Sequence, residues 1–163
     1  MTVRLEKFSS NIINIIEKLL DNQEICNLVG QNGNIPVKNP VLSKDIAPSG
    51  IKERIYPYPF DIDFTDDVRS QIHVYYPSFS FENNGHATEI IVIFDIVVHK
   101  KIWLMTDNKK KVIRAYEIVR NIVSSMNGKN IDGIGKIHFI EGSHTIINSE
   151  FEGVRLVAKL VEF

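Results

Sequence analysis

Apolar side chains recur at helical spacing near the start of the chain. Between residues 5 and 28 they return every three or four positions, which places them on one face of a helix. The members of this face are Leu5, Phe8, Ile12, Ile15, Ile16, Leu19, Leu20, Ile25 and Leu28. Gly30 is a natural end, because glycine favours the position that follows a helix. We expect one packing helix that buries this face, with docking to a partner protein as the alternative.

Residues 31–67 are predicted to form a long loop and extended insertion after this helix. Glycines and prolines interrupt the segment throughout, and Pro57 and Pro59 disfavour helical backbone in the tyrosines that precede them. Compact domains rarely carry about 20 residues without secondary structure. We therefore expect this insertion to be disordered, functional, or ordered only against a neighbouring molecule.

Two runs rich in β-branched residues predict an antiparallel hairpin. Residues 72–81 form the first arm, residues 89–103 the second, and Asn84-Gly85 between them is a strong signal for a tight turn. Both faces of the second arm are largely apolar. We expect the helices to cover one face, and a loop or a second subunit to cover the other.

A second helix is predicted over residues 106–126, with Thr106 or Asp107 as its N-cap. Its expected core stripe is Val112, Tyr116, Val119, Val123 and Met126. Three lysines would then lie in its first turn, where the helix dipole disfavours positive charge. This placement hints at an external anion, although a solvated run of surface charge explains it as well.

The remaining pattern predicts two strands, one at residues 133–139 and one from residue 151 to the C-terminus. A strand at a chain end is well placed at the edge of a sheet. The sequence thus predicts one α+β domain over residues 1–163. In it, a mostly antiparallel sheet of about four to five strands packs against two main helices, with the 31–67 insertion after the first helix.

Composition narrows the class of protein. The chain has 163 residues, of which 44% are hydrophobic and 24% charged, and its formal net charge is -1. A free-standing nucleic-acid binder usually carries a basic excess, so we expect at most a local DNA-facing patch. Cys26 is the single cysteine, and the apolar runs are too short for a membrane helix. We expect a soluble intracellular protein that does not enter a membrane.

The search for catalytic chemistry predicts no enzyme. The histidines lack metal-ligand spacing, the Asp61–Asp67 turn lacks the glycine and glutamate of a calcium loop, and no nucleophile elbow or phosphate loop occurs. Glu89, Asp95 and Lys100 lie along one strand, as in metal-dependent nucleases. However, the two carboxylates are about 20 Å apart in an extended chain and cannot share one metal ion. We expect no catalytic residues, no metal and no cofactor.

Several residues remain as candidates for contacts with other molecules. Asp95 interrupts an apolar strand face, so it requires water or a basic partner from the same or another subunit. Trp103, with lysines nearby, suits an interface anchor as well as it suits core packing. The candidate interface set is Asp95, Lys100, Lys101, Trp103, Arg114 and Arg155; the candidate DNA- or anion-facing set is Lys109, Lys110 and Lys111.

The order of predicted elements resembles that of tail terminators and related tail-completion proteins of tailed bacteriophages. An N-terminal helix, a variable loop, a hairpin, a helix and two final strands recur in that layout over residues 5–163. The segments that carry the resemblance are Arg54-Ile55-Tyr56-Pro57, residues 90–103, Arg114-Ala115-Tyr116-Glu117, residues 133–137 and residues 151–156. The 31–67 insertion is longer than expected for that family.

The resemblance implies a structural virion protein, assembled in the host cytoplasm, that forms a homohexameric ring at the head-proximal end of the tail. Such a ring stops polymerisation of the tail tube and joins tail to head. Its partners would be the tail-tube protein, the head–tail connector or neck proteins, and genomic DNA passing through the channel without sequence-specific binding. The alternatives are another phage neck, connector or tail-tube protein of similar fold, or, further off, a DNA-binding module or a nuclease.

Overall fold

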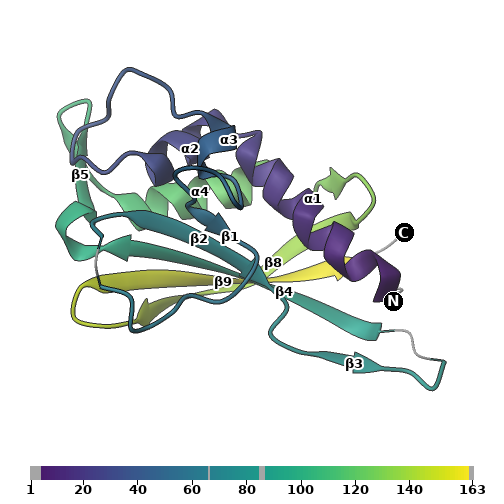
Figure 1. Ribbon diagram of the computed structural model, residues 1–163. Helices are drawn as coiled ribbons and strands as arrows, with labels where there is room; N and C mark the ends of the chain where they lie inside the picture. The colour runs from purple at the N-terminus through teal and green to yellow at the C-terminus, as the bar shows by residue number, and fades with distance from the viewer. Residues whose placement is uncertain (1–4, 66, 85–86, 162–163) are drawn as a thin grey trace.

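The computed structural model describes residues 5–65, 67–84 and 87–161 and shows an α+β fold (Figure 1). Helices lie on one face of a strongly curled sheet, and one hairpin projects away from the body. The helices are α1 (Phe8–Leu20), α2 (Gln23–Gly30), α3 (Ser43–Ile46) and α4 (Arg114–Met126), with single 3-10 turns η1 (Leu5–Lys7) and η2 (Lys100–Ile102). The strands are β1 (Ile55–Tyr56), β2 (Ser70–Tyr75), β3 (Phe79–Phe81), β4 (Ala87–His99), β5 (Leu104–Asp107), β6 (Lys110–Ile113), β7 (Asn130–Ile131), β8 (Gly135–Ile146) and β9 (Phe151–Val161).

The main sheet has seven strands in the order β1-β2-β4-β9-β8-β7, with β3 paired to the far end of β4. Only the β1–β2 pair is parallel. Strands β5 and β6 form a separate two-stranded sheet. The predicted sheet of four to five strands was therefore too small, because two-residue strands such as β1 and β7 leave no alternating pattern in the sequence.

The predicted pairing of residues 72–81 with residues 89–103 is confirmed in its main part. Strand β2 runs antiparallel to β4 from Ser70 opposite Val98 to Tyr75 opposite Ile93, and β3 then resumes the pairing after Pro77. The predicted Asn84-Gly85 turn lies partly outside the described residues. Trp103 is not in the strand, because η2 ends the extended backbone after His99.

The first predicted helix is two helices. Asn22 adopts extended backbone, and its side-chain oxygen accepts hydrogen bonds from the amides of Glu24 and Ile25, so it begins α2 as an N-cap. The end at Gly30 is confirmed. An added Cβ at Gly30 would lie 2.5 Å from the Val41 side chain, so only glycine lets the following loop return this closely.

The predicted helix over residues 106–126 is wrong in its first third. Residues 104–113 form the β5–β6 hairpin, whose turn residues Asn108 and Lys109 both have positive φ, as a tight I′-like turn requires. Helix α4 begins only at Arg114. Its buried side chains are also shifted from the expected stripe: Ala115, Ile118, Ile122 and Met126 face the core, whereas Tyr116 is exposed and Val119 and Val123 are half-buried.

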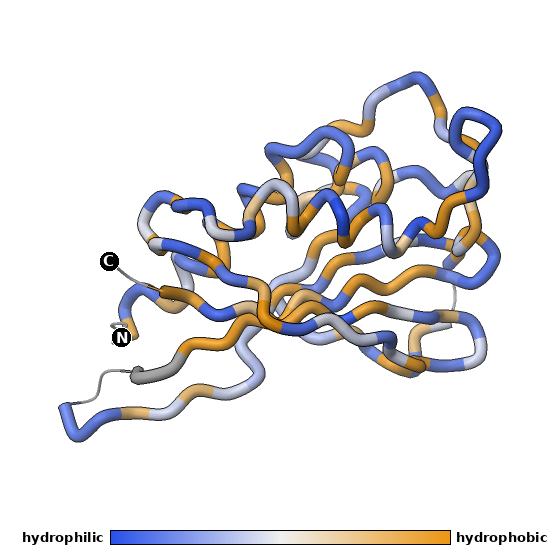
Figure 2. The backbone as a smooth tube through the Cα atoms, turned by 180° about the vertical axis from the view of Figure 1, so that it is seen from behind, coloured by the Kyte–Doolittle hydropathy of each residue, from blue (hydrophilic) through white to orange (hydrophobic). Residues whose placement is uncertain are grey.

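The 31–67 insertion is mostly ordered within the chain. It contains α3 and β1. The Gln23 side-chain amide donates to the Val41 carbonyl oxygen and the Val41 amide donates to Asn27, which ties the segment to α2, and Gln31 donates to the Val37 carbonyl oxygen within it. Phe60 and Phe64 then pack their rings against Phe151 on the face of the sheet opposite the helices. The insertion therefore provides part of the second cover that the two-sided apolar strand requires. Figure 2 shows the apolar central strands, with polar residues gathered in the loops.

The last strand is not at a sheet edge. Strand β9 lies between β4 and β8 and pairs with both along most of its length. Its alternation of buried and partly buried residues fits a central strand equally well, because neighbouring strands, rather than chain position, decide where the edge falls.

Candidate functional site

Asp95 finds its basic partner within the same chain. On the outer face of the sheet, the Arg155 guanidinium donates to both carboxylate oxygens, at 2.8 Å and 3.0 Å, and the Tyr75 hydroxyl donates to Oδ2 at 2.6 Å. Burial and the bond to Asp95 raise the pKa of Tyr75, and the same carboxylate raises the pKa of Arg155. The network satisfies a carboxylate that is otherwise costly to bury. Two other basic residues of the candidate interface set, Arg114 and Lys100, do not contact Asp95 through any hydrogen bond or ion pair described.

Arg114 is inside the subunit and not at its surface. Its guanidinium donates to the carbonyl oxygens of Ile102 at 3.0 Å, Leu28 at 2.8 Å and Gln31 at 3.1 Å, and also to that of Gly33. Two of these carbonyls lie at the C-terminal end of α2, which attracts positive charge. Burial lowers the pKa of Arg114 to about 10, which still leaves it charged at neutral pH. The prediction that Arg114 contacts a partner subunit is therefore wrong for the folded chain.

The remaining predicted interface residues lie near one corner. Lys100 and Lys101 are in η2, and Lys100 Nζ lies 3.6 Å from Glu152. Trp103 is partly buried, with its ring between those of Tyr116 at 6.3 Å and His144 at 5.8 Å. Trp103 therefore links the start of α4 to the second half of β8.

The lysines predicted to face DNA or an anion lie on the β5–β6 hairpin. Lys109 is in its turn, and Lys110 and Lys111 begin β6, with all three exposed. The expected clash with a helix dipole does not occur, because α4 begins after them. Their exposure together with Lys100 and Lys101 makes this corner locally basic in a chain of formal net charge -1.

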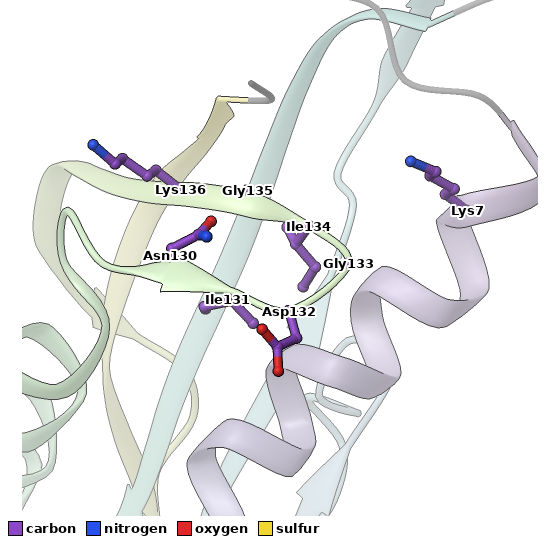
Figure 3. Close-up of a pocket in the computed structure, with 8 residues that line it drawn as sticks. All are labelled: Lys7, Asn130, Ile131, Asp132, Gly133, Ile134, Gly135 and Lys136. Atoms are coloured by element: carbon purple, nitrogen blue, oxygen red, sulfur yellow. The ribbon is translucent and has the colours of Figure 1, made fainter.

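The hollows in the described part of the chain are shallow. One of about 480 Å³ lies at the β7–β8 turn and is lined by residues 130–136, with Lys7 and Lys136 at its sides (Figure 3). Among residues 5–65, 67–84 and 87–161, no group of three histidine, cysteine or acidic side chains could hold a metal ion. The side chain of Glu89, part of the nuclease pattern, lies outside those whose surroundings are described.

A smaller hollow of about 140 Å³ lies beneath the 57–67 loop beside His73. Burial lowers the pKa of His73 to about 4, so the ring is neutral at physiological pH. Its Nδ1 lies 2.7 Å from the Tyr58 carbonyl oxygen and must donate to it. Nε2 is then an acceptor, so the Gln71 amide 3.0 Å away has to present its NH₂ group. Both ring nitrogens of His73 are thus paired within the chain, and His73 holds the loop to the sheet through the Tyr58 carbonyl.

The outer edge of β8 is largely without a strand partner in the described part of the chain. Strand β7 pairs only with Gly135 and Lys136, and one further bridge joins Asn127 to Ile137. From residue 140 to residue 146, no strand in the described part of the chain pairs with this edge. Ile140, at a bulge in the β8–β9 pairing, is 60% exposed, and Ile146 is 87% exposed. We call residues 140–146 the open edge.

A half-buried apolar flank of α4 runs beside the open edge. The helix begins near His144, through Trp103 and Tyr116, and ends where Asn127 bridges Ile137, so it lies antiparallel to β8. Its core residues and its contacts with α2 occupy the other sides. Tyr116, Val119 and Val123 follow at helical spacing on the side away from α2. The helical layer and the sheet therefore both end here with apolar residues at their margin.

The β3–β4 arm, formed by residues 79–84 and 87–90, projects from the body of the protein. It extends away from the helices (Figure 1). Phe79 and Phe81 are 44% and 55% exposed, and their rings pack edge to face with centroids 5.5 Å apart. Phe79 also contacts Phe8 of α1 at 4.9 Å, so these rings lie on the helical side of the sheet.

Comparison with models of protein families identifies the family to which the chain belongs. A family model described as YomW matches residues 22–160, which include the open edge, α4 and the arm. The chain belongs to the YomW family. No curated protein matches it. None of the helices in the described part of the chain is long and apolar enough to cross a membrane.

Sequence reasoning missed the open edge as a site for contact. One signal was present: residues 141–145 read Glu-Gly-Ser-His-Thr, which places polar or small residues on both strand faces. Such a pattern is typical of an edge strand, whereas β9 shows regular alternation. The exposure of Phe79 and Phe81 had no such signal, because an alternating Phe-Ser-Phe run fits a half-buried strand as well.

Proposed function

We propose that this protein is a structural subunit that assembles into a ring at the head-proximal end of a phage tail, where it ends tail-tube polymerisation and joins tail to head. The observation that carries assembly is the open edge of β8. Over residues 140–146, no strand in the described part of the chain pairs with the outer side of β8, which lies beside an apolar helix flank. Monomeric proteins usually shield such edges, because unpaired strands attract other chains.

The phage-tail part of the proposal rests on the resemblance in element order. The α+β layout of a first helical segment, a hairpin, a helix and two final strands is consistent with it. The alternative is another phage neck, connector or tail-tube protein of similar fold, because an open edge would serve assembly in any of these roles. The protein would be located in the virion, after assembly in the host cytoplasm.

Contact with DNA passing through the channel is supported by the exposed lysines of the β5–β6 hairpin and η2. In a ring, such a corner would lower the electrostatic cost of bringing phosphates close without reading sequence. Nothing in this arrangement calls for a cofactor or a bound metal.

The experiment is to measure absolute mass by light scattering over a concentration series, with negative-stain imaging of large species. Purified tail-tube subunits are then polymerised with and without the protein. A closed ring that binds tube ends and halts their growth is the expected result. A particle that stays monomeric both alone and with tail-tube subunits would contradict the proposal. A ring that leaves tube growth unchanged would favour a neck or connector role instead.

A further inference from the structure

The open edge lacks one strand and also lacks cover on its helical side. A strand added along residues 140–146 would satisfy the exposed backbone of β8, and on the helical side it would lie beside the flank of α4. Its side chains on that face would meet Tyr116, Val123 and Trp103, which are exposed or only half-buried. The edge therefore selects an extended segment with apolar residues at alternate positions.

The β3–β4 arm has these properties. Phe79 and Phe81 alternate with Ser80 and point to one side, and the outer edge of β3 pairs with no strand in the described part of the chain. A two-stranded ribbon by itself is only marginally stable in water. The arm gains from a third strand just as the open edge gains from a partner.

We propose that the arm of one copy adds β3 to the open edge of β8 in the next copy, with Phe79 and Phe81 packed under the flank of α4. This inference rests on the proposed ring and names the contact that builds it. The faces agree: the two rings lie on the helical side of their own sheet, and the uncovered flank lies on the helical side of β8. If the sheet continues from one copy to the next with the helices on the same side, the two phenylalanine rings of one copy meet the α4 flank of the other.

The contact is head-to-tail. Donor and acceptor are different parts of the chain, because the arm extends from the β4 end of the sheet and the open edge lies beyond β9. Each copy can therefore give one strand and receive another, which generates a closed ring when the rotation closes. An interface of two identical surfaces would instead stop at a dimer.

The first test uses two charge substitutions in the full chain. Phe81→Glu alters the arm, Ile140→Glu alters the open edge, and Ile51→Glu is the control, since Ile51 is 84% exposed on a loop away from both. We expect each of the first two to weaken self-association by at least about 30-fold, as loss of a central interface contact does. The control should assemble like the wild type, and circular dichroism should show all three folded.

The decisive test mixes the two defective variants. The Phe81→Glu protein retains an intact open edge and the Ile140→Glu protein retains an intact arm, so together they can form one productive contact. We expect a 1:1 heterodimer that grows no further. An edge-to-edge or arm-to-arm interface would give no heterodimer, and that outcome would overturn the inference.

Cross-linking gives an independent readout. Ser80→Cys in one protein and Ser143→Cys in another should form an intermolecular disulfide on mixing under mild oxidation, whereas either alone should form little. Cys26 should not compete, because it is fully buried and burial raises its pKa to about 11. If the wild type forms rings that both charge variants preserve, the arm contact is wrong and the ring proposal stands. If the wild type is monomeric at every concentration, with and without tail tubes, both fail.

Discussion

The two margins of the main sheet differ in how they are completed. At the β1–β2 margin, the two-residue strand β1 pairs in parallel with Ile72 and His73, and the loop that follows it covers the outer face with Phe60 and Phe64. At the β8 margin, β7 also pairs with only two residues and Asn127 bridges Ile137, but no strand or loop ring in the described part of the chain covers residues 140–146 in the same way. At the β1–β2 margin, the chain itself supplies the cover. At the β8 margin, the outer backbone groups of residues 140–146 are left to solvent or to another chain.

This contrast separates residues that hold the subunit together from residues available for assembly. The Asp95–Arg155–Tyr75 network, the Arg114 cluster and the His73–Gln71 pair are satisfied inside the chain. Substitution of such groups should lower stability. Substitution along the open margin should leave stability nearly intact and change association, because those side chains are already in contact with water.

The largest expected effect compares neighbouring residues on the two sides of α4. Ile118 is fully buried in the core, whereas Val119 is half-buried on the flank beside the open edge. Ile118→Asp should cost about 4 kcal/mol or more, because it places a charge in an apolar core. Val119→Asp should cost markedly less and should mainly reduce assembly. Chemical denaturation followed by circular dichroism measures the free energy of unfolding of both variants. Equal decreases would contradict the assignment of Ile118 to the core and of Val119 to the flank.

Arg114→Leu should have the next largest effect on stability. It leaves four carbonyl oxygens without their donor, several of them at the end of α2, and should cost about 3 kcal/mol. Arg120→Leu is the matched control, because Arg120 lies exposed on the same helix and pairs with Glu117 and Glu24 at the surface. It should leave stability nearly unchanged, because exposed ion pairs contribute little. Similar values for the two variants would contradict the burial-based explanation.

The pH dependence of stability should distinguish His73 from a residue of similar shape. The pKa of His73 is about 4 in the folded chain, against an ordinary value of 6.5. Between these values the unfolded chain binds a proton that the folded chain does not, so stability falls as the pH drops from about 6.5 to 4. The full contribution is about 3 kcal/mol.

His73→Phe keeps an aromatic ring against Tyr56, where the rings now stack at 4.8 Å, but cannot titrate. Urea midpoints measured from pH 7 to pH 4 should therefore fall more steeply for the wild type than for this variant. Parallel curves would show that His73 is not the group responsible. Acid titration of carboxylates affects both proteins and cancels in the comparison.

The smallest effect on stability is expected at the lysine corner. Replacing Lys109, Lys110 and Lys111 together by glutamate should change the free energy of unfolding by less than about 1 kcal/mol, since all three are exposed. If this corner faces DNA, the same variant should lose salt-sensitive retention on a DNA column. DNA binding that is unchanged by charge reversal would remove these lysines from any DNA-facing role.

Several parts of the fold follow from local sequence. The α+β class, the apolar face of residues 8–20, the end at Gly30 and the pairing of β2 with β4 were all predicted from spacing and residue type. The prediction failed where one segment fitted both a helical pattern and a hairpin turn. Residues 106–113 fit a helical stripe through Val112, yet Asn108 and Lys109 adopt the left-handed turn of a hairpin and delay α4 to Arg114.

The candidate residues divide in the same way. That Asp95 requires a cation was predictable, because an unpaired buried carboxylate is costly; that the cation is Arg155, 60 positions away in sequence, was not. The role of Arg114 was also hidden, because its four acceptors lie on backbone from two distant segments, residues 28–33 and η2. Every residue has a backbone carbonyl, so the sequence does not show that an arginine is buried among such acceptors and does not distinguish it from a surface arginine.

The sequence by itself determined the long strands, the first helical segment and the apolar face of residues 8–20, because these depend on neighbours within a few residues. Only the tertiary structure decided which strand lies at the margin. Strand β9 ends the chain and yet is central, whereas β8 is left open because β7 is only two residues long. Edge position depends on pairing between distant segments, and the hydrophobic pattern within one strand does not encode which neighbours it receives.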